Sequence, residues 1–179
     1  IEHKIDVSHL DEVGSACDAI TIDIQYSAGE QQVILNGKNV NDFIRTETVS
    51  EMSSKISAIP EVREKLLSLQ RSLAAAENVI MDGRDIGTHV LSNADVKIFL
   101  TADAHVRAVR RYEEFIAKGV SCTLENVERE VIERDERDMN RAIAPLKQAE
   151  DAVRVDTSAM TIEEVVCYLK NLIGQAVAR

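Results

Sequence analysis

The chain has 179 residues, of which 45% are hydrophobic and 29% charged, a composition that predicts one globular domain with a buried core. Its formal net charge of −10 argues against nonspecific binding to nucleic acid or to an anionic membrane surface. Thirteen of its 21 cationic residues are arginine, and several of them cluster, which favours a small anionic ligand in a defined pocket.

The cysteines and histidines indicate neither disulfides nor a metal centre. Cys17, Cys122 and Cys167 lie far apart without a paired metal-binding spacing, which predicts reduced thiols in a cytoplasmic protein. The four histidines are scattered, so we expect no zinc site. No apolar run reaches the length of about 18 residues that spans a bilayer, and the first residues do not resemble a signal peptide, so we expect no membrane partner.

The first predicted elements form an antiparallel meander over residues 19–41. Apolar and polar residues alternate over residues 20–26, as in a half-buried strand, and a second strand is predicted over residues 32–35. Asn36-Gly37 between this strand and the next residues is typical of a two-residue hairpin turn.

Helices and then alternating elements are predicted after the meander. A helix is expected over residues 46–58, and Pro60 suits the first turn of the next one. Further on, the sequence predicts strands at residues 79–81, 96–100 and 152–155, with helices beginning after Asp103, Thr123 and Thr161. Strands that alternate with helices imply a mostly parallel sheet covered on both faces.

Asp82-Gly83-Arg84-Asp85 directly follows the predicted strand at residues 79–81. Polar residues at the carboxyl end of a buried parallel strand are typical of the ligand-binding edge of an open α/β sheet. An aspartate there can hold a metal or its water, and an arginine can bind a phosphate through two nitrogens. The alternative is a strand followed by an ordinary polar turn.

Residues 133–141 form a second polar cluster. One face of the predicted helix carries four charged side chains, Arg134, Arg137, Asp138 and Arg141. Arg134 and Arg141 can bracket Asp138, and such a face can bind a ribose with its carboxylate and a phosphate with its arginines. The alternative is a surface helix with exposed ion pairs that contribute about 0.3–0.5 kcal/mol each.

Four blocks in order across residues 44–158 resemble the bacterial cytidylate kinases of the nucleoside-monophosphate kinase superfamily. They are Ile44-Arg45-Thr46, Asp82 through Thr88, Val96 through Leu100, and Arg134-Asp135 through Arg141 followed by Ala144-Pro145-Leu146. The meander also resembles the monophosphate-binding insert of these enzymes. The resemblance implies phosphoryl transfer from ATP to CMP or dCMP, with Mg²⁺ and without a covalent intermediate.

The resemblance also implies roles for individual residues. Those expected to contact the cytosine are Ser54, Arg63 and Asp85, and those expected to hold the monophosphate are Arg84 and Arg141, with Arg45 joining them. Arg134 and Asp138 are expected to hold the ribose. A short lid over the triphosphate is expected to contain Arg107, Arg110 and Arg111. Within it, Arg107 and Arg110 are expected to bind ATP. Arg110 and Arg111 are expected to act in catalysis, as are Arg84 and Arg141. Asp82 is expected to orient the magnesium shell through water.

The sequence lacks the loop with which this family binds the phosphates of ATP. Nothing in it matches the Gly-x-x-x-x-Gly-Lys-Ser/Thr loop whose backbone amides cradle them. One expectation is that the natural protein carries this loop upstream of an incomplete chain. The other is a short form that binds CMP without transferring phosphate. A third possibility keeps catalysis and changes the acceptor to another nucleoside monophosphate.

The predicted fold class is α/β, with a parallel-sheet P-loop kinase-like core covered by helices, a small antiparallel meander with helices as monophosphate-binding insert, and a short lid. We expect the core over residues 1–18 and 75–179, the insert over residues 19–74, and the lid near residues 107–123. The expected partners are small nucleotides, and the protein is expected to be a monomer.

Overall fold

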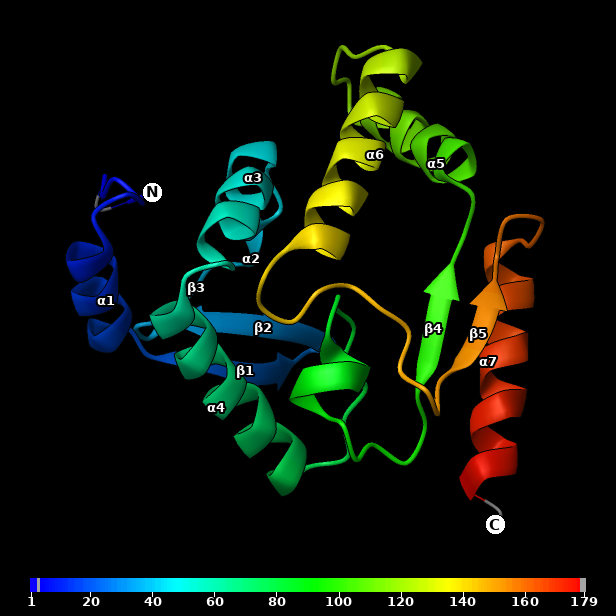
Figure 1. Ribbon diagram of the computed structural model, residues 1–179, viewed down its shortest axis with the longest axis horizontal. Helices are drawn as coiled ribbons and strands as arrows, with labels where there is room; N and C mark the ends of the chain where they lie inside the picture. Colours follow the sequence, from blue (N-terminus) through cyan, green and yellow to red (C-terminus); the bar gives the residue numbers. More distant parts are fainter. Residues whose placement is uncertain (3, 178–179) are drawn as a thin grey trace. The chain divides into compact units, whose positions relative to one another are not determined.

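The computed structural model describes residues 1–2 and 4–177 and divides the chain into two compact units (Figure 1). The first unit spans Ile1–Asn78 and the second Val79–Arg179. The predicted assignment of residues 1–18 and 75–179 to one core stays a prediction, and residues 3, 178 and 179 of it lie outside the described part. No helix of the described residues is both long and apolar enough to cross a membrane.

The first unit contains the predicted antiparallel meander. Its strands are β1 (Ile22–Ser27), β2 (Glu30–Leu35) and β3 (Lys38–Asn39), in that order across the sheet. The hairpin between β2 and β3 turns at Asn36 and Gly37, whose φ angles of 49° and 80° are the positive values of a type I′ turn. The sequence therefore predicted both the pairing and the turn.

Four helices accompany this sheet, namely α1 (Leu10–Ala19), α2 (Asn41–Ile44), α3 (Glu47–Ile56) and α4 (Pro60–Ala76). The core of the unit lies where α1 meets α4, and Val13, Cys17 and Val62 are buried there. The ammonium group of Lys65 donates hydrogen bonds to the Cys17 and Asp18 carbonyls at the end of α1, as expected for a cation at a helix C-terminus.

The second unit combines a parallel pair of strands with a helical hairpin. Its elements are a π-helical turn η1 (Ile86–Val90), β4 (Ile98–Thr101), α5 (Ala104–Ala117), α6 (Leu124–Asn140), β5 (Val153–Asp156) and α7 (Ile162–Val177). β4 and β5 are parallel, with Ile98 opposite Val153. Parallel neighbours require a crossover connection, and α5 and α6 supply it.

Three predicted helix starts in this unit are confirmed by side-chain caps. The Asp103 carboxylate accepts from the first turn of α5, and the Thr123 hydroxyl accepts from Asn126 in α6. Thr161 and Glu164 each accept a hydrogen bond from the other's backbone N–H before α7, which is a complete capping box.

α5 and α6 lie against each other as a helical hairpin (Figure 1). This hairpin has its own apolar core. Ala108 of α5 is fully buried, and it packs with Val127 and Val131 of α6, which are 2% and 7% exposed. The small Ala108 side chain permits close approach of the two helices, and aliphatic residues one turn apart on α6 fill the contact.

The predicted strand at residues 79–81 is wrong. These described residues form no strand, and Ile80 is 94% exposed. The reason is that an apolar run becomes a strand only beside a partner, and β4 pairs with β5 alone among the described strands. The α/β class is confirmed, since the described residues combine a parallel pair, an antiparallel meander and helices.

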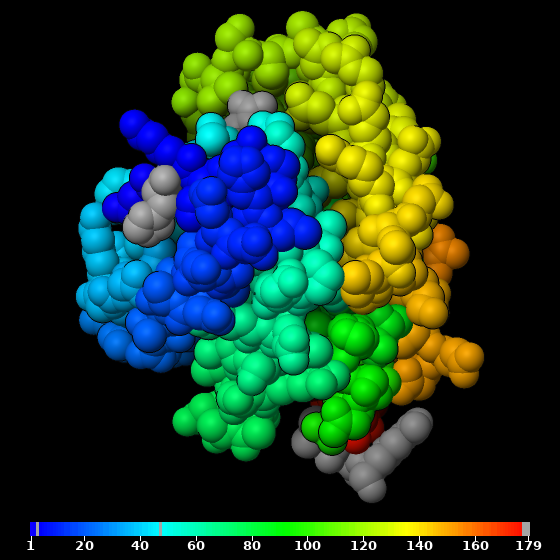
Figure 2. Space-filling model, turned by 60° about the vertical axis from the view of Figure 1, so that its left-hand side comes forward, coloured from blue at the N-terminus to red at the C-terminus, as the bar shows by residue number. Residues whose placement is uncertain are grey.

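A tight turn follows α6. Ala144 has a φ of 46°, which is uncommon for a residue with a side chain, and the Leu146 N–H donates to the Asp138 carbonyl at 2.8 Å. In Figure 2 the yellow and orange residues of α6 and the segment after it form one continuous surface strip. The turn therefore folds the chain back against the last turn of α6.

Candidate functional site

Seven charged residues of the second unit form two sets of ion pairs, which adjoin in the chain at Arg84 and Asp85, and we call them together the arginine–aspartate cluster. Its members are Arg84, Asp85, Arg107, Arg134, Asp135, Asp138 and Arg141. Four arginines and three aspartates give the cluster a formal charge of +1 in a chain whose net charge is −10. It is therefore a local cationic site on an acidic protein.

Arg84 lies between two carboxylates of α6. Its Nε is 3.1 Å from Oδ2 of Asp138, and its Nη1 is 3.9 Å from Oδ1 of Asp135. Asp135 and Asp138 are three residues apart on α6, so both side chains reach the same side of the helix. Both carboxylates thus lie beside the Arg84 guanidinium, whose side chain is 37% exposed.

Arg141 and Asp85 form the second pair of the cluster. Nη2 of Arg141 is 3.4 Å from Oδ1 of Asp85, and both side chains are more than four-fifths buried. Nε of Arg141 also donates to the Ala144 carbonyl at 2.6 Å, so the tight turn after α6 orients the guanidinium. The pair thus joins the segment before η1 to the end of α6.

Asp135 joins α6 to α5. Nη1 of Arg107 donates to Oδ1 of Asp135 at 3.2 Å, and Nη2 donates to Oδ2 at 2.5 Å. Nε of Arg107 donates to the Ala102 carbonyl at 3.0 Å, just after β4. A two-point arginine–carboxylate pair of this kind has a fixed geometry as well as charge complementarity.

Three buried polar atoms of the cluster have no hydrogen-bond partner within the described residues. They are Nε of Arg134, Oδ2 of Asp138 and Nη2 of Arg141. Oδ2 of Asp138 lies 3.1 Å from Arg84 and 3.9 Å from Arg134, so the charges are paired without hydrogen-bond geometry. Unsatisfied buried donors cost about 1–3 kcal/mol each, and a bound anion would satisfy the two guanidinium nitrogens.

Burial, followed by the charge of Arg84, lowers the pKa of the Arg134 guanidinium, whereas Asp138 opposes this shift. The charges of Arg111 and Arg137 lower this pKa further. An arginine side chain keeps its proton in proteins, so this shift of the pKa leaves Arg134 cationic. Several like charges held near one partly buried guanidinium favour binding of a counter-anion.

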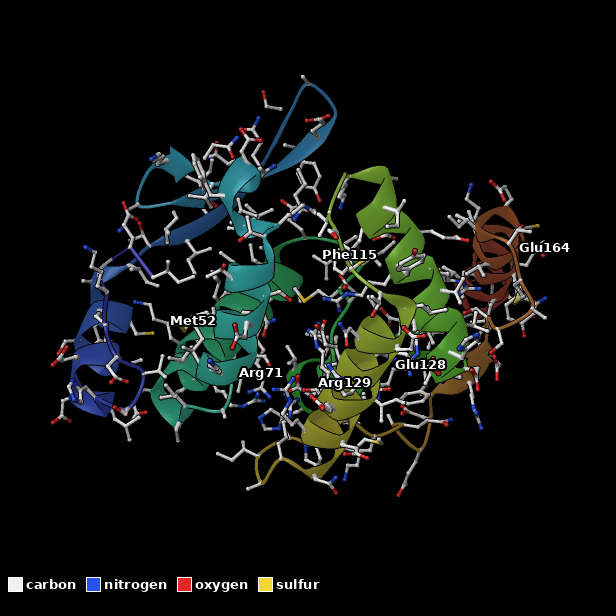
Figure 3. All side chains as sticks on the ribbon, turned by 90° about the horizontal axis from the view of Figure 1, so that it is seen from above. Met52, Arg71, Phe115, Glu128, Arg129 and Glu164 are labelled. Carbon is white, nitrogen blue, oxygen red and sulfur yellow. The ribbon has the colours of Figure 1, made fainter. Side chains whose placement is uncertain are left out.

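The lid arginines have other partners in this structure. Arg110 donates to the Thr157 carbonyl at 2.7 Å and the Met160 carbonyl at 3.2 Å, which lie after β5. The guanidinium of Arg111 lies over the ring of Phe115, which is labelled on α5 in Figure 3. Arg111 is still close enough to Arg134 to lower its pKa.

Two further predictions concern Arg137 and Asp82. Arg137 is exposed, so it does not join Arg134 and Asp138 as the helical spacing predicted, although its charge reaches Arg134. Asp82 is also exposed, and the described residues contain no group of three metal-binding side chains. A single exposed carboxylate fits the predicted contact to Mg²⁺ through water, because Mg²⁺ keeps several waters and takes few protein ligands.

The remaining predicted residues lie in the first unit, around the junction of α3 and α4. The Ser57 hydroxyl donates to the Ser54 carbonyl at 2.8 Å, and Nη1 of Arg63 donates to the Ser57 carbonyl at 3.3 Å. Ser57 thereby links Ser54 with Arg63. Arg45 is exposed at the end of α2. Their roles toward a nucleotide stay predictions.

Asp135 is the member of the arginine–aspartate cluster to which the sequence analysis assigned no role. Its signal is present in the pattern of α6, where Val127, Val131 and Asp135 recur every four residues on the side that faces α5. A carboxylate that continues an apolar stripe has to be paired, because a buried charge without a partner is strongly unfavourable.

Comparison with known proteins identifies the family. Residues 1–175 match the family model described as cytidylate kinase. A cytidylate kinase of Carboxydothermus hydrogenoformans is 52% identical over 86% of this chain and 70% of its own length. The cytidylate kinases of Lactobacillus johnsonii and Bacillus cytotoxicus are 45% and 41% identical over 97% and 100% of the chain, and 76% and 80% of their own lengths. The chain therefore belongs to the cytidylate kinase family.

Proposed function

We propose that this protein transfers the γ-phosphoryl group of ATP to CMP or dCMP, with Mg²⁺ as the metal. The observation that carries the proposal is the pair of buried guanidinium nitrogens on Arg134 and Arg141 that lack hydrogen-bond partners among the described residues. They belong to a cluster in which the predicted monophosphate-binding and ribose-binding residues contact one another. Membership of the cytidylate kinase family supplies the substrate.

In the proposed complex, Arg84 and Arg141 bind the monophosphate of CMP. Both guanidinium groups are held by carboxylates, so little side-chain entropy remains to be lost on binding. Arg134 and Asp138 bind the ribose. Phosphoryl transfer needs positioning and positive charge more than a nucleophilic side chain, and the cluster supplies both.

We propose that Asp85, with Ser54 and Arg63, recognises the cytosine. Asp85 lies 3.4 Å from Arg141, and an aspartate carboxylate can only accept hydrogen bonds. Cytosine offers an amino donor to such an acceptor, whereas uracil has an oxygen at this position. An unpaired buried acceptor costs about 1–3 kcal/mol, which disfavours UMP.

Bound Mg²⁺ supplies positive charge at the phosphates, and Asp82 would hold it through water. Arg110 and Arg111 are proposed to approach the ATP phosphates, with Arg107 beside them. The free thiols of Cys17, Cys122 and Cys167 are consistent with the proposed cytoplasmic location. A monomer remains the proposed oligomeric state.

The test is a calorimetric titration of CMP and of UMP into the 179-residue chain without ATP. We expect CMP to bind more tightly than UMP by about tenfold or more, corresponding to one unpaired acceptor. The Asp85→Ala variant should lose most of this preference, because the group that distinguishes the two bases is removed. Asp95→Ala is the matched control, since Asp95 belongs to the same unit and lies outside the cluster. Equal losses of CMP and UMP affinity in Asp85→Ala would show that Asp85 does not recognise the base.

A further inference from the structure

Asp135 uses both of its carboxylate oxygens to contact arginines from two different segments of the chain. Arg107 of α5 donates to both oxygens, and Arg84 lies 3.9 Å from Oδ1. The Asp135 side chain is 18% exposed, so water screens these contacts only in part. Asp135 therefore connects the helical hairpin with an arginine that is proposed to bind phosphate.

The Arg107 side of this connection is anchored to the backbone. Nε of Arg107 donates to the Ala102 carbonyl, directly after β4, while the fully buried Ala108 holds the same turn of α5 against α6. All three nitrogens of Arg107 are thus engaged, and the position of the Asp135 carboxylate is fixed relative to β4 and α5. A carboxylate fixed in this way can position a further cation.

On the other side of Asp135, the group that is positioned is the guanidinium of Arg84. Arg84 follows a segment without secondary structure, so its backbone alone does not determine where the guanidinium lies. The Asp138 carboxylate lies 3.1 Å from Nε and the Asp135 carboxylate 3.9 Å from Nη1, and opposite charges beside two different nitrogens favour one orientation of a planar group. With Asp138 alone, the guanidinium retains rotation about one contact.

We infer that Asp135 is a positioning residue, which orients Arg84 for the phosphate of the nucleotide through its own pairing with Arg107 and without touching the substrate. This inference rests on the proposed function, because the phosphate is that of CMP. It makes the integrity of the α5–α6 hairpin a condition for phosphate binding. The part of the affinity that depends on the phosphate should respond to Asp135, and the part that depends on the nucleoside should not.

The test compares CMP with cytidine by calorimetry in the wild-type chain, in Asp135→Asn and in Glu136→Gln. The asparagine side chain keeps the shape of the aspartate and removes its charge, and Glu136 is an exposed acid beside it on α6 that serves as the control. We expect Asp135→Asn to weaken CMP binding about five- to tenfold, to leave cytidine binding unchanged, and to add little in an Arg84→Lys background. Glu136→Gln should alter neither ligand.

A measurement without ligand separates this inference from the proposed function. The ¹⁵N order parameter of the Arg84 Nε–H group should fall in Asp135→Asn and stay at the wild-type value in Glu136→Gln. An unchanged order parameter, or equal losses for CMP and cytidine, would overturn the positioning role. Failure of the wild-type chain to bind CMP would instead contradict the proposed function and leave the order parameter to decide on Asp135.

If Asp135→Asn fails to fold, the Arg107→Lys variant tests the positioning role of Asp135 instead. Lysine retains the charge and removes the two-point geometry, so Asp135 loses its fixed position. We expect a loss of CMP affinity of about two- to fivefold with cytidine unchanged. A fall in the unfolding temperature without a change in the ratio of CMP to cytidine affinity would show that the Arg107–Asp135 pair serves stability alone.

Discussion

At the scale of single residues, Asp138 is the most constrained member of the cluster. It is 8% exposed, and its Oδ2 lies within 4 Å of both Arg84 and Arg134. The carboxylate lies between two guanidinium groups of like charge. Burial and then the charge of Arg84 lower the pKa of Arg134, and Asp138 opposes this shift. We therefore expect Asp138 to stabilise the folded chain even when no ligand is bound.

We predict that Asp138→Asn destabilises the chain by about 1–2 kcal/mol, since two partly exposed arginines lose their shared counter-charge and water screens part of the loss. The free energy of unfolding in urea measures this effect. Asp95→Asn, at a position outside the cluster, should change it by less than about 0.5 kcal/mol. A stability equal to that of the wild type would mean that solvent alone satisfies Arg84 and Arg134.

At the scale of elements, α5 and α6 are joined at two places. Arg107 in the first turn of α5 pairs with Asp135, and Nδ1 of His105 in the same turn lies 3.0 Å from Oε2 of Glu128. Figure 3 labels Glu128 on the side of α6 toward α5. The hydrogen bond with Glu128 and then its charge raise the pKa of His105, with a smaller contribution from Asp103, while burial opposes the shift.

This shift predicts a pH dependence of the hairpin. A raised pKa in the folded chain means that the contribution to stability is complete below the unfolded value of about 6.5 and is lost as the pH rises through the folded value. The difference in unfolding temperature between the wild type and Glu128→Gln should therefore be larger at pH 5.5 than at pH 8.5. Glu130→Gln, which alters an exposed acid of the same helix, should show no such trend. A constant difference would refute the role of the charged pair.

The local signals of the sequence predicted the elements well. Asn36-Gly37 and the caps at Thr123 and Thr161 depend on neighbouring residues alone, and each is present in the structure. The strand expected at residues 79–81 failed because strand formation depends on a partner that the local sequence does not reveal.

The sequence singled out six of the seven residues of the arginine–aspartate cluster, but it did not predict how they pair. Helical spacing was expected to place Arg141 beside Asp138, but α6 ends at Asn140, and Arg141 leaves the helix with a ψ of 142°. Arg141 therefore contacts Asp85, while Arg84 takes the place beside Asp138. The role of Asp135 depends on how α5 packs against α6, which helical periodicity alone does not determine.

At the scale of the whole molecule, a small cationic site belongs to a chain of net charge −10. A nucleoside monophosphate carries negative charge itself, so the long-range field of the chain opposes its approach, and the cluster attracts it only at short range. Salt screens exposed charges over about 10 Å at 0.1 M and affects buried contacts less.

We therefore predict that the association rate of CMP does not fall when NaCl is raised from about 20 to about 200 mM, and that it rises by up to about twofold as the repulsive field is screened. Stopped-flow measurements with the wild-type chain give this rate directly, and potassium glutamate in place of NaCl controls for competition by chloride at the arginines. A steep fall in both salts would show that the local arginines dominate already at long range.

The turn after α6 limits which substitutions this chain can accept. Ala144 holds a φ of 46°, where a β-branched side chain is strongly disfavoured and glycine or asparagine is accepted. Its carbonyl is the acceptor that orients Nε of Arg141. Ala144 has no charged or reactive group, yet its backbone conformation matters because its carbonyl orients Arg141. We therefore expect position 144 to accept substitutions according to whether the new residue adopts a positive φ, and not according to its polarity or size.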